Sequence, residues 1–430
     1  MILIPLHLGM FFLASLFCHG ELAASRPHPR HLTGFYLWMS VGGVLGGVFN
    51  TLLAPVLFDR VIEYPLGLLL ACLLLPQVTI DKSRIKARIG DIIGPVLLAA
   101  LVIGLSRFTE SLARNNYHPV FFLLFAITGL ACFSFKERRW RFALAFGVLL
   151  LTMAHMADLV RGNQVYASRN FFGVKRVVAN GNTGIRYLYH GTTVHGSQWL
   201  ASDRRVTPLT YYHPSGPVGD IFVDSDPATD KSHVAIIGLG VGALASYAHP
   251  GEHFTFYEID PEVERIARNK RFFGFLAGTQ GSLEVVLGDG RLSLARAKPG
   301  GFNIILLDAF SSDAIPVHLI TREAVALYLS KLQTQGLLVF HISNRYLNLE
   351  PLMAGLAEEF GLRCIIRRDS GNSRDPNQAG KLPSIYAAMG RPGSAIRHLA
   401  DNPQWQPIGP DTQPIVWTDR FSNLILLMKW

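Results

Sequence analysis

Long apolar runs fill most of the first 156 residues and constrain the fold of this chain more than any other feature. A helix that crosses a bilayer needs about 20 mostly apolar residues, and charged or polar connectors bound each run. We therefore expect a multi-pass α-helical membrane domain over residues 1–157, with about six spans. The runs cover residues 2–18, 35–58, 65–80, 92–105, 119–135 and 142–156.

The charges of the chain exclude several classes of partner. The formal net charge is +9, but much of the excess lies in the short connectors 82–88 and 136–141, as is typical of segments that flank a membrane. Because no stretch interleaves basic and aromatic residues, we expect no nucleic-acid partner.

The four cysteines form no CxxC pair, so neither a disulfide framework nor a metal site is predicted.

The membrane domain is predicted to be an anchor rather than a transport pathway. A transporter of cations needs carboxylates inside its apolar helices, because a cation in a low dielectric must be paired. Asp59, Glu63 and Asp91 lie only at the edges of the runs. The lipid bilayer is therefore an expected partner, and the expected location is the cell membrane.

The residue pattern changes after residue 158. Two β-favouring runs, 171–178 and 185–189, flank Asn180-Gly181, which indicates a hairpin, so a small β-rich domain is predicted over 158–230. Apolar strand candidates and helical patterns then alternate over 231–430. This alternation predicts a Rossmann-like, doubly wound and mostly parallel seven-stranded sheet of the methyltransferase type. The strand candidates are 233–238, 254–258, 283–287, 302–307, 336–342, 362–367 and 384–389, with helices at 261–269 and 321–332.

A glycine-rich turn follows the first of these strands. In Gly238-Leu239-Gly240-Val241-Gly242-Ala243, the missing side chains let the backbone approach a nucleotide at the start of a helix. The second strand ends at Glu258, the spacing expected of an acid that accepts hydrogen bonds from ribose hydroxyls. Ala243 also fits the variant of this turn that binds nicotinamide or flavin cofactors, so that alternative stays open.

Acidic residues follow two further strands. Asp289 lies in the turn Gly288-Asp289-Gly290, and Asp308 opens a loop that also contains Asp313. Because the carboxyl ends of parallel strands meet at one edge of a sheet, we expect Glu258, Asp289 and Asp308 to converge on one cleft. Asp260, in contrast, is expected only to cap the helix that Pro261 begins.

These motifs carry a family resemblance. The glycine turn with Glu258, the Asp289 turn and the Asp308 loop resemble the polyamine aminopropyltransferases, the spermidine synthase family. The resemblance extends back through Gly191 to Gln198 and through Tyr211-Tyr212-His213, and it covers about 171–390. With apolar helices ahead of it, the chain is most similar to membrane-fused spermidine synthase-like proteins.

The resemblance implies transfer of an aminopropyl group from decarboxylated S-adenosylmethionine to an amine such as putrescine, without a metal. It implies that Asp308 removes the amine proton, that Glu258 binds the ribose, and that Asp289 binds the adenine. The amine substrate would be held by Tyr212, His213, Asp313 and Gln198, and the donor also by Gly238, Gly240, Gly242 and Gly290.

Two other functions remain open. The synthases typically have an acid before the last glycine of the turn, where this chain has Val241. This difference leaves open a methyltransferase that uses S-adenosylmethionine, and also a catalytically silent nucleotide-binding regulator of the membrane domain. The sequence also leaves a homo-oligomer open.

The orientation in the membrane follows from two opposing arguments. With six spans, the basic connectors share one side, and the positive-inside rule would then place the catalytic domain outside the cell. The implied donors are cytosolic metabolites, and Arg161, Arg169, Lys175 and Arg176 near the last span balance part of the bias. We therefore expect a cytoplasmic catalytic domain and a number of spans that differs from six.

Several other polar residues have structural interpretations as well. His190 and His195 are expected to be structural or exposed, since they lack a metal-ligand pattern. His341 and Asn344 follow the fifth strand, where they either line the pocket or cap the strand. The segment 417–419 either closes over a substrate or packs.

Overall fold

The computed structural model divides the chain into two compact units, Met1–Gly162 and Asn163–Trp430. Each unit is described by itself, and the domain boundaries at 157 and 230 stay predictions. The described residues are 3–75, 93–101, 103–104, 118–136, 138–161, 163–223, 231–310, 315–371 and 378–429.

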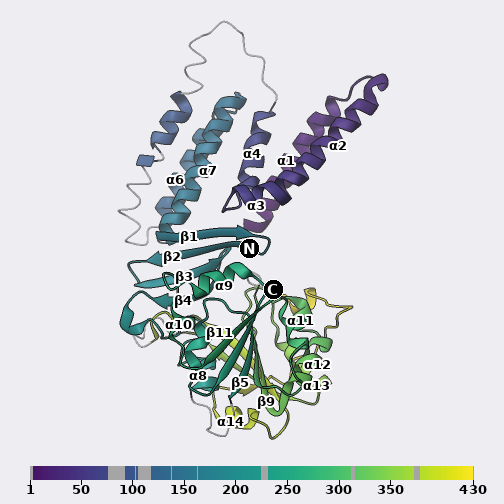
Figure 1. Cartoon of the computed structure of the whole chain (residues 1–430). Coiled ribbons are helices and arrows are strands. Elements are labelled where there is room, and N and C mark those ends of the chain that lie inside the picture. Colours follow the sequence, from purple (N-terminus) through teal and green to yellow (C-terminus); the bar gives the residue numbers. More distant parts are fainter. Residues whose placement is uncertain are drawn as a thin grey trace. The chain divides into compact units, whose positions relative to one another are not determined.

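The first unit is helical, and each predicted apolar run contains helix where it is described (Figure 1). Within the described ranges, two helical stretches are long and apolar enough to cross a bilayer, Pro5–Ala24 and Pro29–Leu57. A multi-pass domain is not established by these two. The helices are α1 (Leu3–Ala24), η1 (Pro29–His31), α2 (Leu32–Val48), the π-helical η2 (Phe49–Leu53), α3 (Ala54–Leu57), α4 (Glu63–Leu73), α6 (His118–Phe133) and α7 (Arg139–Arg161), with further helix at 93–101.

The second unit begins with a four-stranded antiparallel sheet in sequence order. The hairpin predicted at Asn180-Gly181 is present between the second and third strands. The Asn180 carboxamide oxygen accepts the backbone N–H of Asn182 at 3.0 Å, and the Asn180 carbonyl accepts that of Gly184 at 2.9 Å. The strands are β1 (Asn163–Asn170), β2 (Gly173–Asn180), β3 (Ile185–His190) and β4 (Thr193–Trp199).

A second sheet has the order β12-β10-β11-β9-β8-β5-β6-β7. All seven predicted strands are present, and the sheet is parallel except at β11, which runs antiparallel between β9 and β10, and at the two-residue edge strand β12. The Rossmann-like fold class is therefore confirmed. The strands are β5 (His233–Ile237), β6 (His253–Glu258), β7 (Ser282–Leu287), β8 (Phe302–Leu307), β9 (Leu332–His341), β10 (Arg363–Asp369), β11 (Ser384–Gly390) and β12 (Gln406–Pro407).

Helices cover both faces of this sheet, so its central strands are apolar on both sides. Along β5, Val234 and Ile236 join one buried cluster, whereas Ala235 and Ile237 join the other. The helices are α8 (Pro217–Phe222), α9 (Pro261–Arg268), α10 (Phe275–Gly278), α11 (Gly290–Ala295), α12 (Arg322–Lys331), α13 (Glu350–Glu359) and α14 (Ile396–Asp401), with 3₁₀ turns η3 (Ser202–Arg204), η4 (Ala243–Tyr247), η5 (Val317–Leu319) and η7 (Ile425–Leu427).

The segment after the glycine turn differs from the prediction. The sequence predicts a helix there, but only the five-residue 3₁₀ segment η4 follows Gly242. Pro250 lies three residues beyond its end, and the residue before a proline is disfavoured in the α conformation. The turn therefore offers its backbone groups to a ligand without a long helix dipole behind them.

A buried ion pair joins α8 to β10. Arg367 donates to Asp220, and both side chains are almost fully buried. The same Asp220 carboxylate accepts the indole N–H of Trp405 at 2.8 Å, and Arg367 also donates to the Ser215 carbonyl at 2.9 Å. A buried charge is tolerated only when it is paired and hydrogen-bonded, and here both conditions are met.

We predict that Arg367→Met lowers the free energy of unfolding by about 3–5 kcal/mol, because it leaves Asp220 buried without its cation. Arg363→Met is the matched control, since Arg363 lies exposed on the same strand and should change the stability by less than about 0.5 kcal/mol. Urea unfolding of the purified chain, followed by tryptophan fluorescence, measures both. Equal effects of the two substitutions would contradict the prediction.

Candidate active site

A cavity of about 780 Å³ lies at the carboxyl edge of the parallel strands. Glu258 at the end of β6, Asp289 after β7 and Asp308 after β8 all line it, and so do residues of the four-stranded sheet. The expectation that these three carboxylates share one cleft is confirmed. Topology explains the convergence, because β8, β5, β6 and β7 are consecutive neighbours in the sheet.

Two glycines of the turn form part of the cavity wall. Gly238 has a φ of +106° and Gly240 a φ of +54°, conformations that residues with a side chain rarely adopt. A Cβ on Gly238 would lie 2.4 Å from the Asp308 carbonyl oxygen, and one on Gly240 would lie 2.7 Å from the His195 carbonyl oxygen. Both positions therefore require glycine to keep the backbone close to the cavity.

The last residues of the turn, Val241 and Gly242, pack against neighbouring elements and do not line the cavity. Gly242 does not line the cavity, and a Cβ there would meet Leu276 at 2.8 Å. The Val241 side chain is fully buried against β4, where a Cβ on Gly196 would lie 2.5 Å from it. Direct contact between Gly242 and a donor is thus not supported, because this residue is needed for close packing against α10.

Glu258 is held by two backbone donors. Its carboxylate accepts the N–H of Leu239 at 3.0 Å and the N–H of Asp260 at 2.9 Å, and the residue is 8% exposed. Burial raises the pKa of Glu258 above its usual value, while the two hydrogen bonds act in the opposite direction. Glu258 therefore ties the glycine turn to the end of β6 while it lines the cavity.

Asp289 begins α11. It accepts the backbone N–H of Leu292 at 2.8 Å, as an N-cap does, and its other oxygen contacts His318 Nε2 at 3.1 Å. Gly290 also lines the cavity, and a Cβ there would lie 2.5 Å from the Ile237 side chain. The sequence pattern did not single out His318, which reaches this acid from 29 residues further along the chain.

Asp308 has the most elaborate surroundings of the three acids. Its side chain is 6% exposed, Oδ2 accepts the hydroxyl of Tyr212 at 2.6 Å, and Oδ1 lies 2.6 Å from His341 Nδ1. Burial and the neighbouring Asp308 carboxylate hold the pKa of Tyr212 well above its usual value. Tyr212 is therefore a neutral donor to this carboxylate.

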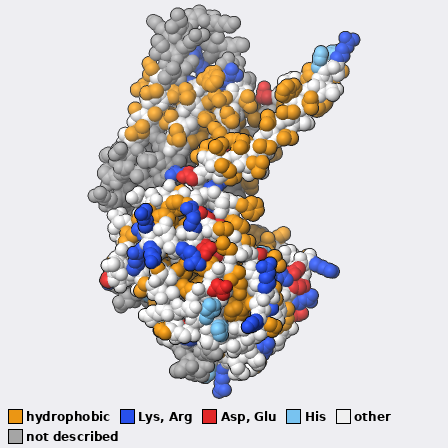
Figure 2. Space-filling view, viewed as in Figure 1, with side chains coloured by type: hydrophobic (Ala, Val, Ile, Leu, Met, Phe, Trp, Pro, Cys, Tyr) orange, Lys and Arg blue, Asp and Glu red, His pale blue; other side chains and the backbone are white. Residues whose placement is uncertain are grey.

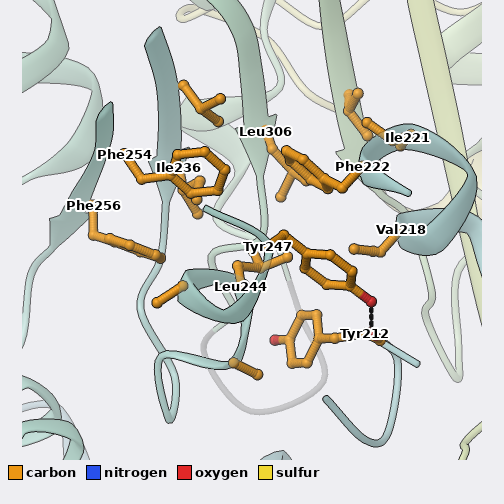
Figure 3. Close-up of a cluster of buried hydrophobic side chains, with 14 of the residues drawn as sticks. Tyr212, Val218, Ile221, Phe222, Ile236, Leu244, Tyr247, Phe254, Phe256 and Leu306 are labelled. Atoms are coloured by element: carbon orange, nitrogen blue, oxygen red, sulfur yellow. Dashed lines mark hydrogen bonds between the residues drawn. The ribbon is translucent and has the colours of Figure 1, made fainter. Parts of the chain in front are cut away.

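The backbone that carries Tyr212 is fixed from the core. The hydroxyl of Tyr247 donates to the Tyr212 carbonyl at 2.5 Å, as the dashed line in Figure 3 marks. Tyr247 stacks on Phe222 in the same buried cluster, and burial raises the pKa of its phenol. The apolar core thus sets the position of a side chain in the cavity wall.

His341 lines the cavity and is enclosed by aromatic rings. It stacks on Tyr386 with a centroid distance of 4.4 Å and an interplanar angle of 5°, and its Nε2 lies 2.8 Å from Ser343 Oγ. Of the two interpretations left open by the sequence, the pocket wall is correct. The rings of Phe310 and Tyr211 flank it as well.

Two predicted amine-binding residues are directed elsewhere. Gln198 is buried, donates to the Arg205 carbonyl at 2.7 Å and accepts the Gly274 N–H at 3.1 Å. His213 turns back on Ser215, whose hydroxyl lies 2.9 Å from its Nδ1. Neither residue lines the cavity, because other groups of the chain occupy both side chains. Asp313 lies outside the described residues.

The contacts of His190, His195 and the segment 417–419 show which of these lie at the cavity and which pack in the core. His190 and His195 both line the cavity, and His190 donates to the Phe172 carbonyl at 2.6 Å, so its ring also ties the end of β3 to the turn between β1 and β2. Burial lowers the pKa of His190. Trp417 is buried in the core and Asp419 pairs with Arg291 at 2.7 Å, which supports the packing interpretation of this segment.

A buried ion pair that the sequence did not suggest also lines the cavity. Lys175 on β2 pairs with Asp260, which caps α9 through the backbone N–H of Glu262 at 2.9 Å, as predicted. Asn170 contacts both partners, at 2.5 Å from Lys175 and 2.6 Å from Asp260. The pair therefore fixes the four-stranded sheet against the α/β sheet across the cavity.

Within the described part of the chain, no three His, Cys, Asp or Glu side chains are grouped as metal ligands. The residues that line the cavity supply carboxylates, phenols, imidazoles and backbone amides, together with the cations Lys175, Arg345 and Arg368. These groups can orient a polar ligand, accept a proton and hold a neutral or cationic amine.

Comparison with known proteins places this site in a family. No protein-family model matches the chain. A polyamine aminopropyltransferase from Vibrio vulnificus (strain CMCP6) is 39% identical over 211 residues, which cover 45% of this chain and 69% of the relative. A probable spermidine synthase from Corynebacterium glutamicum ATCC 13032 is similar in structure, with 17% identity, a TM-score of 0.44, and coverage of 61% of this chain and 98% of the other. The spermidine synthase of Thermotoga maritima gives 14% identity, a TM-score of 0.39, and coverage of 60% and 82%. On the identity and coverage of the curated relative, the chain belongs to the polyamine aminopropyltransferase family of transferases.

Proposed function

We propose that this chain transfers an aminopropyl group from decarboxylated S-adenosylmethionine to an amine such as putrescine. The observation that carries the proposal is the Asp308 carboxylate, bonded to Tyr212 and set in one cavity with Glu258 and Asp289. In the reaction, the C–N bond to the amine forms as the C–S bond breaks, and sulfur keeps the electron pair in methylthioadenosine. Only an unprotonated amine has the lone pair for this attack, so a nearby base is required.

Each acid has a proposed role that fits its surroundings. Glu258 accepts hydrogen bonds from the ribose hydroxyls of the donor, and Asp289 accepts one from the adenine amino group. The backbone at Gly238 and Gly240 lets the sulfonium end come close to the sheet. Asp308 takes the proton of the amine, with Tyr212 fixing its second oxygen. The enzyme contributes mainly orientation and one proton acceptor.

Val241 favours a second candidate, a methyltransferase that uses S-adenosylmethionine. The residue is fully buried and does not line the cavity, so no acid at this position holds an amino group of the donor. A catalytically silent regulator that binds the nucleoside is the third candidate, and it would bind a donor without forming either product.

We also propose that the helices of the first unit anchor the chain in the cell membrane as a multi-pass domain, with the catalytic unit in the cytoplasm. Hydrophobic side chains, orange in Figure 2, cover much of the surface of these helices. Phe12, Trp38 and Val56 are among the exposed ones. Apolar surface of this extent on a helix is stable in lipid rather than in water. The donor is a cytosolic metabolite, which favours the cytoplasmic orientation.

The first test is the product. Purified chain incubated with decarboxylated S-adenosylmethionine and putrescine should release methylthioadenosine, and little should form without the amine. With S-adenosylmethionine, release of S-adenosylhomocysteine would instead support the methyltransferase. If both donors bind in calorimetry and neither product forms, the silent regulator is the correct description.

Asp308→Asn should lower kcat by about 10²–10⁴-fold, because the amide cannot accept the amine proton, while donor affinity stays within a few-fold. Asp203→Asn is the control, since this exposed acid lies outside the cavity and should leave kcat unchanged. A kcat of Asp308→Asn near that of the unmodified chain would remove Asp308 from the base role.

Gly238→Ala should weaken donor binding by at least about tenfold, because its Cβ would clash with the Asp308 carbonyl and move both strand ends. Gly251→Ala is matched to it, with a similar φ of +93° but open space around its Cβ. Calorimetric titration with the donor measures both variants. Similar losses in the two would show that backbone strain, rather than the close approach, determines binding.

For the membrane domain, the chain should stay in the membrane pellet after an alkaline carbonate wash. A reporter fused after Trp430 should be active only in its cytoplasmic format. Release by the wash would exclude the anchor, and activity only in the extracytoplasmic format would reverse the proposed orientation.

A further inference from the structure

We propose that His341 is a positioning residue for the Asp308 base, an inference that rests on the proposed transfer to an amine. His341 ends β9 and is 3% exposed, and its Nδ1 lies 2.6 Å from Asp308 Oδ1. Tyr212 holds the other oxygen at 2.6 Å. The carboxylate is thus gripped from both sides, and His341 contributes the contact opposite Tyr212.

The contacts of Ser343 and Asp308 together define the hydrogen bonds of the His341 imidazole. Ser343 Oγ accepts the backbone N–H of Ile385 at 2.8 Å, so its own hydroxyl hydrogen is available for His341 Nε2, which lies 2.8 Å away. A carboxylate oxygen only accepts, so His341 Nδ1 carries a hydrogen and donates it to Asp308 Oδ1, and Nε2 is left to accept the Ser343 hydroxyl. The chain of donors therefore runs from the β11 backbone to the carboxylate.

The enclosure of the ring fixes its orientation. Tyr386 stacks on one face at 4.4 Å, and Phe310 and Tyr211 approach at 4.8 and 5.1 Å. A flip of the imidazole would break both hydrogen bonds inside this packed shell. Among the described residues, the titratable groups in contact with the ring are Asp308, Tyr211 and Tyr386, and burial holds the pKa of Tyr386 well above its usual value. The cations Arg345 and Arg368 and the acid Asp369 line the same cavity.

The consequence concerns the charge state of the base. Burial by itself favours the protonated form of a carboxyl group, which could not accept a proton from the amine. A hydrogen bond donated to the ionised form favours that form. His341 therefore keeps Asp308 ionised and fixed, and the remaining lone pairs of its oxygens stay available to the substrate.

The step balances without another reactant. The ammonium of the acceptor gives one proton to the Asp308 carboxylate, which leaves a neutral amine and a neutral carboxyl group. The amine nitrogen then forms the C–N bond while the C–S bond breaks towards sulfur. Afterwards Asp308 returns its proton to water. His341 keeps its own proton throughout, so its part is orientation and charge stabilisation.

Two substitutions test this role. In His341→Ala, kcat at pH 7 should fall about 10- to 100-fold, and the acid limb of kcat/KM should move up by about one to two pH units, as loss of a hydrogen bond to a charged group implies. His341→Asn should largely rescue both, because its amide nitrogen takes nearly the place of Nδ1. His253→Ala is the control, at the opposite end of β6 from Glu258.

A purely structural role predicts a different result. In that case His341→Ala would lose activity equally at every pH, and His341→Asn would be no better. Either result would overturn the inference. Ser343→Ala adds an independent check, since it removes the donor to Nε2 and should produce a smaller shift of the acid limb in the same direction.

A readout that needs no turnover separates this inference from the proposed function. In ¹⁵N NMR of the full chain with labelled histidine, His341 should show a protonated Nδ1 and an unprotonated Nε2, and Asp308→Asn should change that signal. If the unmodified chain forms no methylthioadenosine yet shows this signature, the proposed function fails while the pairing stands. A protonated Nε2 with a bare Nδ1 would refute the pairing whatever the activity.

Discussion

The parallel pairing of β8, β5, β6 and β7 is the constraint on which the site depends. Ladder hydrogen bonds continue past the strand ends, from Asp308 N–H to the Ile237 carbonyl at 2.8 Å and from Gly238 N–H to the Tyr257 carbonyl at 2.9 Å. Neighbouring strands lie about 4.8 Å apart, so the residues just beyond these four strands are held along one edge of the sheet, with the ends of β8 and β7 about 14 Å apart. The acids therefore share a cavity because the sheet places them there, before any side-chain contact forms.

Once the acids are buried at one edge, each needs donors to offset its lost hydration. Glu258 takes two backbone amides, Asp289 takes a helix N-terminus and His318, and Asp308 takes a phenol and an imidazole. The kind of donor sets what each acid can do. Backbone donors hold Glu258 in place, and Asp289 in part, whereas the Asp308 carboxylate is held by two side chains.

This difference in donors also explains what the sequence could and could not predict. The seven strands and the glycine turn follow from local period and composition, and the acids at the strand ends follow from the strands. Tyr212 and Asp308, in contrast, are 96 residues apart, and their bond depends on how the β-rich region packs on the sheet. The same packing turns Gln198 to Gly274, 76 residues away, and no local pattern records that choice. The sequence could place His341 at a strand end. Its contact with Asp308 could not be predicted, because it depends on β9 lying next to β8 in the sheet.

The packing of Val241 bears on the choice between donors. A Cβ at Gly196 would lie 2.5 Å from Val241, and Gly196 has a φ of +127°. β4 and the glycine turn can therefore pack this closely only because residue 196 is a glycine and residue 241 is apolar. An acid at 241 would be a buried charge against a strand, which is costly without a partner. The Val241 side chain does not line the cavity, so it bears on the donor only through the acid that is missing at this position. Discrimination between aminopropyl and methyl transfer then falls to residues that do line the cavity, and Asp308 with its two donors is the group there that needs an amine for its chemistry.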